Sequence, residues 1–351
     1  MLTASSPVRP LARPERGARQ VEAVAVTTLP ELQHLAPEWE RLWSAARASP
    51  FQSPAWLVPW WKNIGEGSLA SVALRSTNDG ALVGFAPLYI YTDTDRHERH
   101  LFPLGIATTD RLDILTLPGW REPVGEALVR HLARHADAWD IFEAPQLADG
   151  SALLTLRWPQ GWRRELAEGE ANPVLPLPAS IPRSMAHNLA YCRRRAARDA
   201  DVTYGLADAQ SLPSWLDTLD RLHAQRWALR DLPGVLRGGG VLDWHREAAP
   251  HLLAAGLLRA LSLRIAGRVV AVLHVLADAP AVPDRRWYYY LGGFDPDAAS
   301  LSPGTLLVGH AIEQAQAEGA AGFDFLRGSE PYKQRWGAAN QPMTTLRIRR
   351  D

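Results

Sequence analysis

The alternation of hydrophobic and polar residues predicts the same succession of elements twice along the chain. Alternation at every second residue indicates a strand, and apolar residues three or four positions apart indicate a helix. Each half has a helical lead-in, two strands joined in a hairpin, a further helix and a closing strand. The matching elements are expected at residues 69–75, 81–91, 122–136 and 139–143 in the first half, and at 257–265, 268–276, 303–318 and 323–326 in the second. The sequence therefore predicts an α/β (α+β) fold of two tandem, duplicated units, each with a mixed central sheet flanked by helices.

Composition suggests where these units begin and end. Residues 1–20 are rich in Pro, Arg, Ala and Ser and carry little to bury, so a disordered tail is predicted. The Pro-rich stretch 172–182 is predicted to link two domains. The first domain is then expected over residues 21–171 and the second over residues 183–351.

The start of the helix predicted at residue 303 is a candidate ligand site. Ser302 can cap the helix, Pro303 suits its first turn, and Gly304 lets a ligand approach the backbone. Free N–H groups at a helix start bind phosphate, although Ser-Pro-Gly is also an ordinary helix cap. Neither the Walker pattern nor the Gly-x-Gly-x-x-Gly dinucleotide pattern is present there.

Bulk composition narrows the possible functions. The 351 residues suit two domains, and the hydrophobic fraction of 46% is ordinary for a globular protein. The 38 basic and 38 acidic residues balance, which argues against a general binder of nucleic acid or anionic membranes but allows a local basic groove. The single cysteine, Cys192, excludes an intramolecular disulfide and a cysteine-based zinc site. We find no transmembrane-length apolar run and no hydrophobic signal core, so we expect a cytoplasmic protein.

Several motifs occur in a fixed order between Phe51 and Trp336. They are Phe-Gln-Ser-Pro-Ala-Trp at 51–56, Ala-Pro-Leu at 86–88, Thr-Asp-Arg-Leu-Asp at 109–113, Leu-His-Ala-Gln-Arg-Trp at 222–227, Tyr-Tyr-Leu-Gly-Gly-Phe-Asp at 289–295, Leu-Ser-Pro-Gly at 301–304 and Phe-Asp-Phe-Leu-Arg-Gly-Ser-Glu-Pro-Tyr-Lys at 323–333. In this order they resemble the GNAT-fold acyltransferases of the CelD-like (cellulose-biosynthesis-associated) group. That group is related to the FemAB aminoacyltransferases, which carry two GNAT-like units in tandem.

The resemblance implies transfer of an acyl group from a thioester, usually acetyl-CoA, to an amine or hydroxyl. In GNAT folds the donor lies between two splayed strands, and its pyrophosphate meets the start of the following helix. The corresponding donor contacts here are Ser302, Pro303, Gly304, Thr305 and Leu306. The usual Arg/Gln-x-x-Gly-x-Gly/Ala loop is not present. The FemAB branch uses aminoacyl-tRNA in place of acyl-CoA.

Direct acyl transfer needs a base for the nucleophile, a donor for the oxyanion and a proton for the leaving thiolate. The candidate bases are Glu330, Asp324 and His223. Each also has a structural interpretation. Glu330 suits the first turn of a helix, Asp324 could pair with Arg327 or Arg335, and a helical histidine such as His223 often only makes structural hydrogen bonds.

Other side chains are candidates for binding. Tyr290 could protonate the thiolate, while Lys333 and Tyr332 could bind a phosphate or carboxylate, or donate to the oxyanion and thiolate. Asp110 and Asp113 could bind an acceptor amine from the first half, or simply cap turns. The remaining predicted substrate contacts are Arg226, Trp227 and Arg327. Lys333 could equally be a surface lysine, and a metal site is not expected because the histidines are scattered.

These observations leave three hypotheses open. The first is an N- or O-acyltransferase that uses acyl-CoA as co-substrate and a small molecule or glycan as acceptor, as in polysaccharide biosynthesis. In it the second unit carries the chemistry, and the first unit serves as scaffold and acceptor wall. The second is a FemAB-like transferase drawing on aminoacyl-tRNA, although the neutral net charge argues against a tRNA partner. The third is a non-catalytic protein that kept the fold for assembly.

Overall fold

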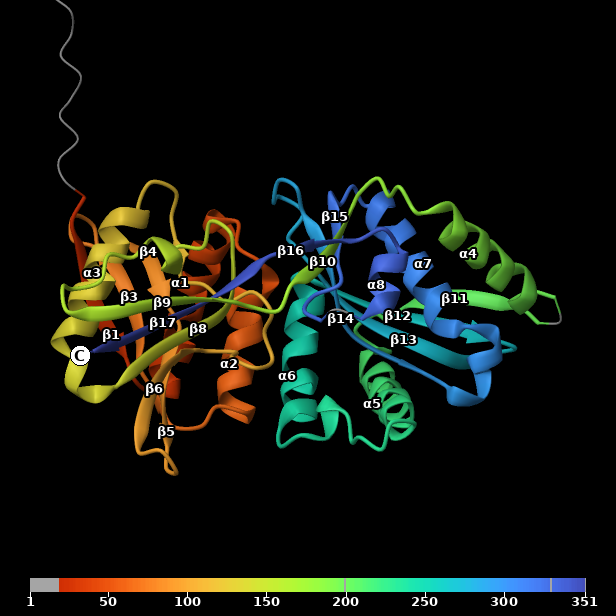
Figure 1. The fold of residues 1–351 in the computed structure, drawn as a ribbon, viewed down its shortest axis with the longest axis horizontal. Coiled ribbons are helices and arrows are strands. Elements are labelled where there is room, and N and C mark those ends of the chain that lie inside the picture. The colour runs from red at the N-terminus through yellow and green to blue at the C-terminus, as the bar shows by residue number, and fades with distance from the viewer. Residues whose placement is uncertain (1–18, 199, 329, 351) are drawn as a thin grey trace, which may run out of the picture.

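The computed structural model describes residues 19–198, 200–328 and 330–350. It has two halves that lie side by side (Figure 1), and in each of them helices cover β-sheet. The second half has one seven-stranded sheet, and the first half has a four-stranded and a six-stranded sheet. The predicted disordered tail falls almost entirely outside the described residues. No helix in the described ranges is both long and apolar enough to cross a bilayer.

The first half is built from the N-terminal elements. They are β1 (Val21–Val26), α1 (Leu29–Ala46), α2 (Pro54–Asn63), β2 (Ser68–Leu69), β3 (Ser71–Ser76), β4 (Leu82–Ala86), β5 (Leu88–Asp93), β6 (Glu98–Pro103), β7 (Leu115–Thr116), α3 (Arg121–Arg134), β8 (Ile141–Ala148) and β9 (Trp162–Glu168). Helix α1 begins with a capping box, because Thr28 and Glu31 satisfy each other's backbone N–H groups. Its apolar face buries Leu32, Trp39 and Leu42 against the sheet.

The second half follows from residue 172 onward. Its elements are β10 (Asn172–Pro176), α4 (Arg183–Ala196), β11 (Val202–Leu206), α5 (Leu212–Ala228), α6 (Val241–Ala254), β12 (Leu258–Ile265), β13 (Arg268–Ala277), β14 (Arg286–Phe294), α7 (Pro303–Ala317), β15 (Gly322–Asp324), α8 (Pro331–Arg335), β16 (Ala339–Gln341) and β17 (Met343–Arg350). Short 3-10 turns lie at Pro50–Gln52, Ala136–Ala138, Leu153–Thr155, Val235–Arg237 and Pro296–Leu301.

The two halves share one strand order. In the second half it is β11-β12-β13-β14-β15-β10-β16, with β14 and β15 parallel and every other neighbour antiparallel. The first half repeats the pattern as β1-β3-β4, then β5-β6-β8-β17-β9, with β6 and β8 as its parallel pair. Pro87 separates β4 from β5, so the first sheet is divided there. The duplicated α/β architecture predicted from the sequence is confirmed.

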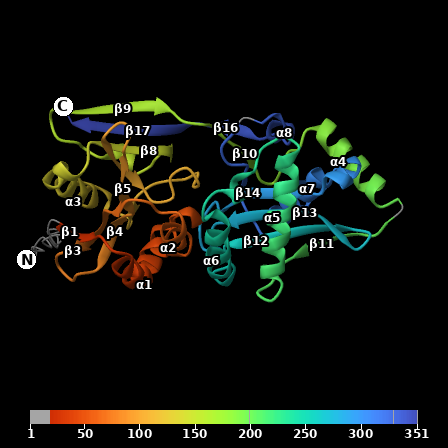
Figure 2. The ribbon, with the colours of Figure 1, turned by 90° about the horizontal axis from the view of Figure 1, so that it is seen from below.

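The C-terminal strand β17 belongs to the first half's sheet, and β10, which directly follows that half in sequence, belongs to the second half's sheet. Strand β17 lies between β8 and β9 in the first half, and β10 lies between β15 and β16 in the second (Figures 1 and 2). The two crossings run antiparallel, since the N–H group of Gly169 donates to the carbonyl of Met343 at 2.8 Å between the two sets of paired strands. The segments β9–β10 (residues 162–176) and β16–β17 (residues 339–350) therefore form a two-stranded antiparallel ribbon that runs from one sheet into the other. We call it the crossing ribbon.

This ribbon differs from the predicted linker at 172–182 and from a second domain that keeps all of 183–351. Val174 and Leu175 are buried in the second sheet, and the carbonyl of Pro173 accepts a hydrogen bond from the N–H group of Phe325. The prolines made residues 172–176 look like a linker. A proline lacks only its N–H donor, so Pro173 fits a strand position where its carbonyl is the group used.

A shared hydrophobic core joins the halves. Trp56 and Trp60 of α2 pack with Trp244 and Leu252 of α6, and the Trp56 and Trp244 ring centroids are 4.5 Å apart. The indole N–H group of Trp244 donates to the carbonyl of Trp56 at 3.1 Å. This continuous core holds the loops of the first half against the sheet of the second.

Candidate functional site

The parallel strands β14 and β15 separate at the centre of the second sheet. They pair only at Arg286–Gly322, Trp287–Phe323 and Tyr288–Asp324, after which β15 ends and β14 continues to Phe294. A bulge in β14 follows immediately, because the residues flanking Tyr290 pair with adjacent residues of β13 and leave Tyr290 as the extra residue. A bulge bends a strand and re-aims its side chains, so a gap opens beside Tyr290.

Two adjoining cavities fill this gap. One, of about 240 Å³, lies between the halves, and the other, of about 210 Å³, lies at the start of α7. Arg226, Tyr289 and Tyr332 line both cavities. These shared residues place the two cavities next to each other, one at the start of α7 and the other against the first half.

Glycines allow α5 to approach this passage closely. A Cβ atom at Gly293 would lie 2.5 Å from the backbone nitrogen of His223 and 2.6 Å from the backbone carbon of Leu222. Only glycine permits that contact. The approach brings His223, Arg226 and Trp227, all predicted from the sequence, to the cavity wall.

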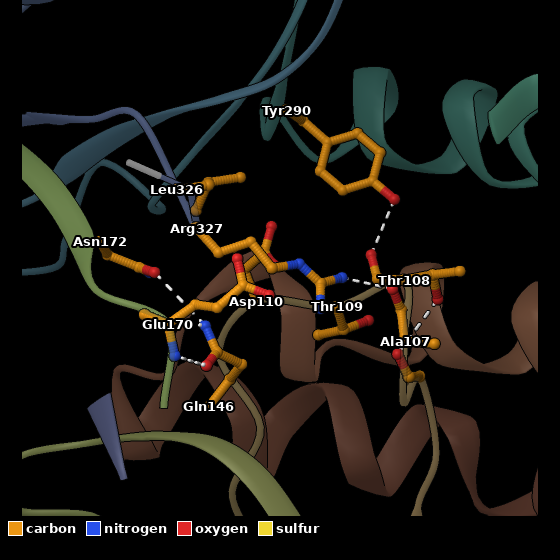
Figure 3. A network of polar contacts seen from close by, with 12 residues as sticks. Ala107, Thr108, Thr109, Asp110, Gln146, Glu170, Asn172, Tyr290, Leu326 and Arg327 are labelled. Carbon is orange, nitrogen blue, oxygen red and sulfur yellow. Dashed lines mark hydrogen bonds and ion pairs between the residues drawn. The ribbon is translucent and has the colours of Figure 1, made fainter. Parts of the chain in front are cut away.

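A loop of the first half closes the larger cavity (Figure 3). The hydroxyl of Tyr290 donates to the carbonyl of Thr108 at 2.7 Å, and Arg327 donates to the carbonyl of Ala107. Arg327 Nε also lies 2.6 Å from Asp110 Oδ1. Burial raises the pKa of Asp110 to about 6, although the charge of Arg327 acts to lower it. The predicted contribution of Asp110 and Arg327 to one site thus has a geometric basis.

A polar clamp holds the crossing ribbon behind that loop. The side-chain amide of Gln146 donates to the carbonyl of Glu170 at 3.1 Å, and its oxygen accepts from the N–H group of the same residue at 3.0 Å (Figure 3). The amide also reaches Asn172 Oδ1 at 3.5 Å. The clamp fixes where the chain leaves the first sheet for the second.

Asp324, a predicted base, is engaged in an ion pair between the halves. Its fully buried carboxylate lies 2.5 Å from Arg111 Nη2 and accepts a hydrogen bond from the N–H group of Leu326 at 2.8 Å. The structural partners considered from the sequence were Arg327 and Arg335, whereas the observed partner is Arg111. Asp324 lines neither cavity. Its contacts fit it for holding the halves together.

Lys333 is buried, not a surface lysine. Its Nζ donates to the carbonyls of Leu326, Arg327 and Gly328 at 3.2, 2.6 and 3.3 Å. It also lies 2.9 Å from Glu330 Oε2. These partners account for its donors, so Lys333 fixes the turn that forms one wall of the larger cavity.

Glu330 lines the larger cavity and remains half exposed. Partial burial is the largest single influence and acts to raise the pKa of Glu330. The hydrogen bonds from Lys333 and from its own backbone N–H group, together with the charges of Lys333 and Arg226, outweigh it, so the pKa lies below its usual value. Glu330 is therefore ionised at neutral pH and reachable by a substrate. Tyr332 shares the wall, and burial raises its pKa.

Asp113 lies away from both cavities. Its carboxylate accepts hydrogen bonds from the N–H groups of Ile114, Ala152 and Leu153 at 2.8, 2.8 and 3.1 Å. Burial raises its pKa while these hydrogen bonds act to lower it. The structure thus favours the turn-capping interpretation of Asp113 over binding of an acceptor.

The start of α7 presents open backbone to the smaller cavity. Gly304 and Thr305 line it, whereas Pro303 and Leu306 are buried in the core, so the five predicted donor contacts divide. Ser302 does not cap the helix through its side chain; its Oγ accepts from Arg195 Nη2 at 2.9 Å. Arg226 and Arg335 line the same cavity. Three guanidinium groups, those of Arg195, Arg226 and Arg335, thus lie around the N-terminus of α7. Of these, Arg226 had been predicted as a binding residue from the sequence.

Two buried histidines lie behind Tyr290. His245 and His274 have ring centroids 5.3 Å apart, and each ring is within 5.6 Å of the Tyr290 ring. In the described part of the chain, neither ring nitrogen of either residue has a hydrogen-bond partner. Burial lowers the pKa of His274 to about 4 and that of His245 well below its usual value.

Replacing His274 with leucine is expected to weaken the pH dependence of stability. The ordinary histidine pKa of 6.5 exceeds the folded-state value of about 4, so the unfolded chain takes up the proton first as pH falls. The parent should lose roughly 2 kcal/mol through this residue between pH 7.5 and 5, and His274→Leu should not. Urea unfolding at both pH values measures the difference. The exposed-site control His34→Leu should keep the parental dependence, and an unchanged dependence in His274→Leu would contradict the prediction.

Two histidines four residues apart lie at the end of α3: His131 is in its last turn and His135 directly follows it, with ring centroids 4.6 Å apart. Within the described ranges no third histidine, cysteine, aspartate or glutamate joins them to make a metal-binding group.

The second half of the chain is similar to a known protein family. Residues 183–334 match the family model described as "Acetyltransferase (GNAT) domain". This match covers most of the second half, including most of the residues that line the two cavities. This part of the chain is therefore similar to GNAT acetyltransferase domains. No curated protein matches the sequence.

Solved structures are similar to the chain over both halves. FemX has a TM-score of 0.64 and 10% identity, with 93% of this chain and 96% of that chain covered. The C-terminal DUF2156 domain of a proposed lysylphosphatidylglycerol synthetase from Agrobacterium fabrum has a TM-score of 0.58 and 12% identity, with 90% and 92% covered. L-PGS from Bacillus licheniformis has a TM-score of 0.53 and 12% identity, with 79% and 82% covered. At such identities the likeness is one of fold.

Proposed function

We propose that this GNAT-type protein is an acyltransferase that moves an acyl group from acyl-CoA to an amine or hydroxyl by direct attack. The observation that carries the proposal is the pair of adjoining cavities between β14 and β15. One begins at a helix start and the other ends at a loop of the opposite half. A donor with a diphosphate at one end and a thioester at the other matches that layout.

The donor's diphosphate would lie at the tip of α7. Gly304 and Thr305 line a cavity that Arg226 and Arg335 also line, with Arg195 beside Ser302. The N-terminus of a 15-residue helix carries partial positive charge and unpaired donors. Guanidinium groups add charge-assisted hydrogen bonds to phosphate. The pantetheine arm would then run past Tyr289 and Tyr332 toward Tyr290.

The acceptor would enter from the side of the first half. Asp110 would bind its amine, and the ionised Glu330 would take the proton released by the nucleophile. The nucleophile's electron pair forms the new bond to the acyl carbon, and the carbon–sulfur bond breaks with its electrons on sulfur. Tyr290 lines the larger cavity, and its hydroxyl would turn from the carbonyl of Thr108 to supply the proton to that thiolate. The first unit would serve as scaffold and acceptor wall.

The proposal also includes a family group and an acceptor class. We place the protein in the CelD-like group on the order of its motifs, with a small molecule or glycan as acceptor. An aminoacyl-tRNA donor is the main alternative donor and a non-catalytic role in assembly the other. Calorimetric titration with acetyl-CoA, combined with a thiol-release assay over a panel of amines and sugars, tests the acyl-CoA-dependent transfer. Retention of tRNA on a filter without any CoA binding would favour the aminoacyl-tRNA donor.

Placing tryptophan at residue 304 is expected to abolish CoA binding without unfolding the protein. A Cβ at Gly304 meets only Phe294 at 3.9 Å, so a larger side chain projects into the smaller cavity and not into the core. Affinity for acetyl-CoA should fall by at least about 100-fold, equivalent to roughly 2.7 kcal/mol. Calorimetry measures the loss, and circular dichroism checks the fold.

Gln314→Trp is the matched control, because Gln314 is exposed on the same helix and lines neither cavity. It should bind acetyl-CoA as the parent does. Parental affinity for acetyl-CoA in Gly304→Trp would contradict the placement of the diphosphate at the tip of α7.

A further inference from the structure

His223 lies in the wall of the larger cavity with one ring nitrogen occupied and the other free. It is 2% exposed and belongs to α5. One helical turn later, Trp227 Nε1 donates to His223 Nε2 at 2.9 Å. His223 Nδ1 is buried and has no hydrogen-bond partner among the residues that the structure describes.

The contact with Trp227 determines the tautomer of the ring. An indole N–H group only donates, so Nε2 must carry the lone pair and Nδ1 must carry the hydrogen. Burial, followed by the charges of Arg226 and Arg237, lowers the pKa of His223 to about 4. At neutral pH the ring is uncharged, and its only acceptor is already engaged. This arrangement is unsuited to a general base, the role considered for His223 from the sequence.

Gly234 keeps space beside the free edge of the ring. This residue adopts φ +76°, and a Cβ there would lie 2.7 Å from His223 Cε1 and 2.8 Å from His223 Nδ1. Any larger residue would press on the imidazole. The loop at Gly234 and helix α5 therefore hold a buried N–H group that has no acceptor among the described residues, which costs stability. A ligand oxygen in the cavity would satisfy it.

We infer that His223 is a neutral hydrogen-bond donor whose Nδ1–H group binds the carbonyl oxygen of the transferred acyl group, with Trp227 as the positioning residue that fixes its tautomer. The inference rests on the proposed acyl transfer. As the nucleophile bonds to the acyl carbon, an electron pair moves onto the carbonyl oxygen. That pair returns when the carbon–sulfur bond breaks. His223 transfers no proton and ends each cycle as the neutral ring with which it began.

The size of the effect follows from where charge develops. A buried donor aimed at an oxyanion strengthens its hydrogen bond in the transition state, and removing one such donor costs on the order of 10²–10³ in kcat. An uncharged donor also binds the neutral carbonyl oxygen of the ground state, but it binds the oxyanion of the transition state more strongly. KM should therefore move much less than kcat.

The tautomer is tested first, without any substrate. Protein carrying ¹⁵N-labelled histidine is examined by NMR between pH 5.5 and 8, and the His223 signals are assigned by their loss in His223→Gln. We expect a neutral ring with hydrogen on Nδ1 at every pH. In Trp227→Phe, Nε2 of His223 is free, so the ring should populate the second tautomer and take up a proton more readily. The charges of Arg226 and Arg237, which oppose protonation, and the neighbouring His245 are unchanged in this variant.

Kinetics with the acyl-CoA and acceptor found by the panel give the second test. His223→Leu should lower kcat about 100-fold or more, and His223→Gln, whose side-chain amide can still donate, should recover part of it. Trp227→Phe should lower kcat several-fold and add an acidic limb to the pH–rate profile, which loss of packing alone would not produce. Parental kcat in His223→Leu would overturn the inference.

The two tests separate the inference from the proposed function. If no acyl-CoA is bound or turned over, the proposed function fails while the NMR result still reports the tautomer. If acyl transfer occurs but the ring carries its hydrogen on Nε2 or titrates near pH 6.5, the proposed function stands and the role of His223 is overturned.

Discussion

Ending the chain after Pro342 is expected to unfold the first half of the molecule, although every removed residue is more than 170 positions from that half's last strand in sequence. Strand β17 is an inner strand of the first sheet, and its Met343, Leu346 and Ile348 are buried at 2% exposure or less. Burial of three such side chains contributes roughly 5–9 kcal/mol, which is comparable to the whole stability of a domain. Hydrogen exchange followed by mass spectrometry should show lost protection in β8 and β9.

Point variants within β17 provide the control. Ile348→Ala removes a buried side chain and should destabilise the first half by about 2–5 kcal/mol. Thr345→Ala, at a half-buried position of the same strand, should have a much smaller effect. Full protection of β8 and β9 in the truncated protein would contradict the role assigned to β17. By the same reasoning, residues 21–171 or 183–351 expressed alone should not fold.

Replacing Arg111 with methionine should destabilise the protein by about 3–5 kcal/mol, the usual cost of removing one partner from a buried ion pair. Asp324 is fully buried and has its closest basic partner in Arg111, with Arg286 at 3.9 Å. The variant leaves a carboxylate in the core without its main compensating charge. Urea unfolding at pH 7 measures the change in unfolding free energy.

The paired variant Arg111→Met with Asp324→Asn distinguishes charge from packing. Its asparagine can still accept from the N–H group of Leu326, and no charge remains to be buried. It should therefore be more stable than Arg111→Met alone. Equal losses in the single and paired variants would mean that Arg111 acts through packing, for example over the Tyr288 ring, whose centroid lies 5.6 Å away.

Much of the fold could be predicted because its signals are local. The hairpin strands, α3, α7 and the repeated order follow from periodicities that any strand or helix displays. Strand exchange could not be predicted, since period-two alternation identifies a strand and not its partner. Residues 343–350 were expected as a strand, but nothing in them specifies β8 and β9 as neighbours.

The candidate site was predictable in its residue types and less so in their roles. The motifs brought together His223, Arg226, Asp110 and Tyr332, and the larger cavity contains all four. Asp324 has a carboxylate suited to a base, yet its burial beside Arg111 gives it a structural partner. A side chain's partner from the other half of the chain is set by tertiary packing, which a single sequence does not display.

The crossing ribbon also constrains how the molecule is made. During synthesis, the first half lacks an inner strand until residues 343–350 have emerged from the ribosome. Until then β8 and β9 each present an unpaired edge, the kind of surface that invites mispairing. The N-terminal half should therefore be the last part to reach its native state, and chaperone dependence during translation would be a measurable consequence of that delay.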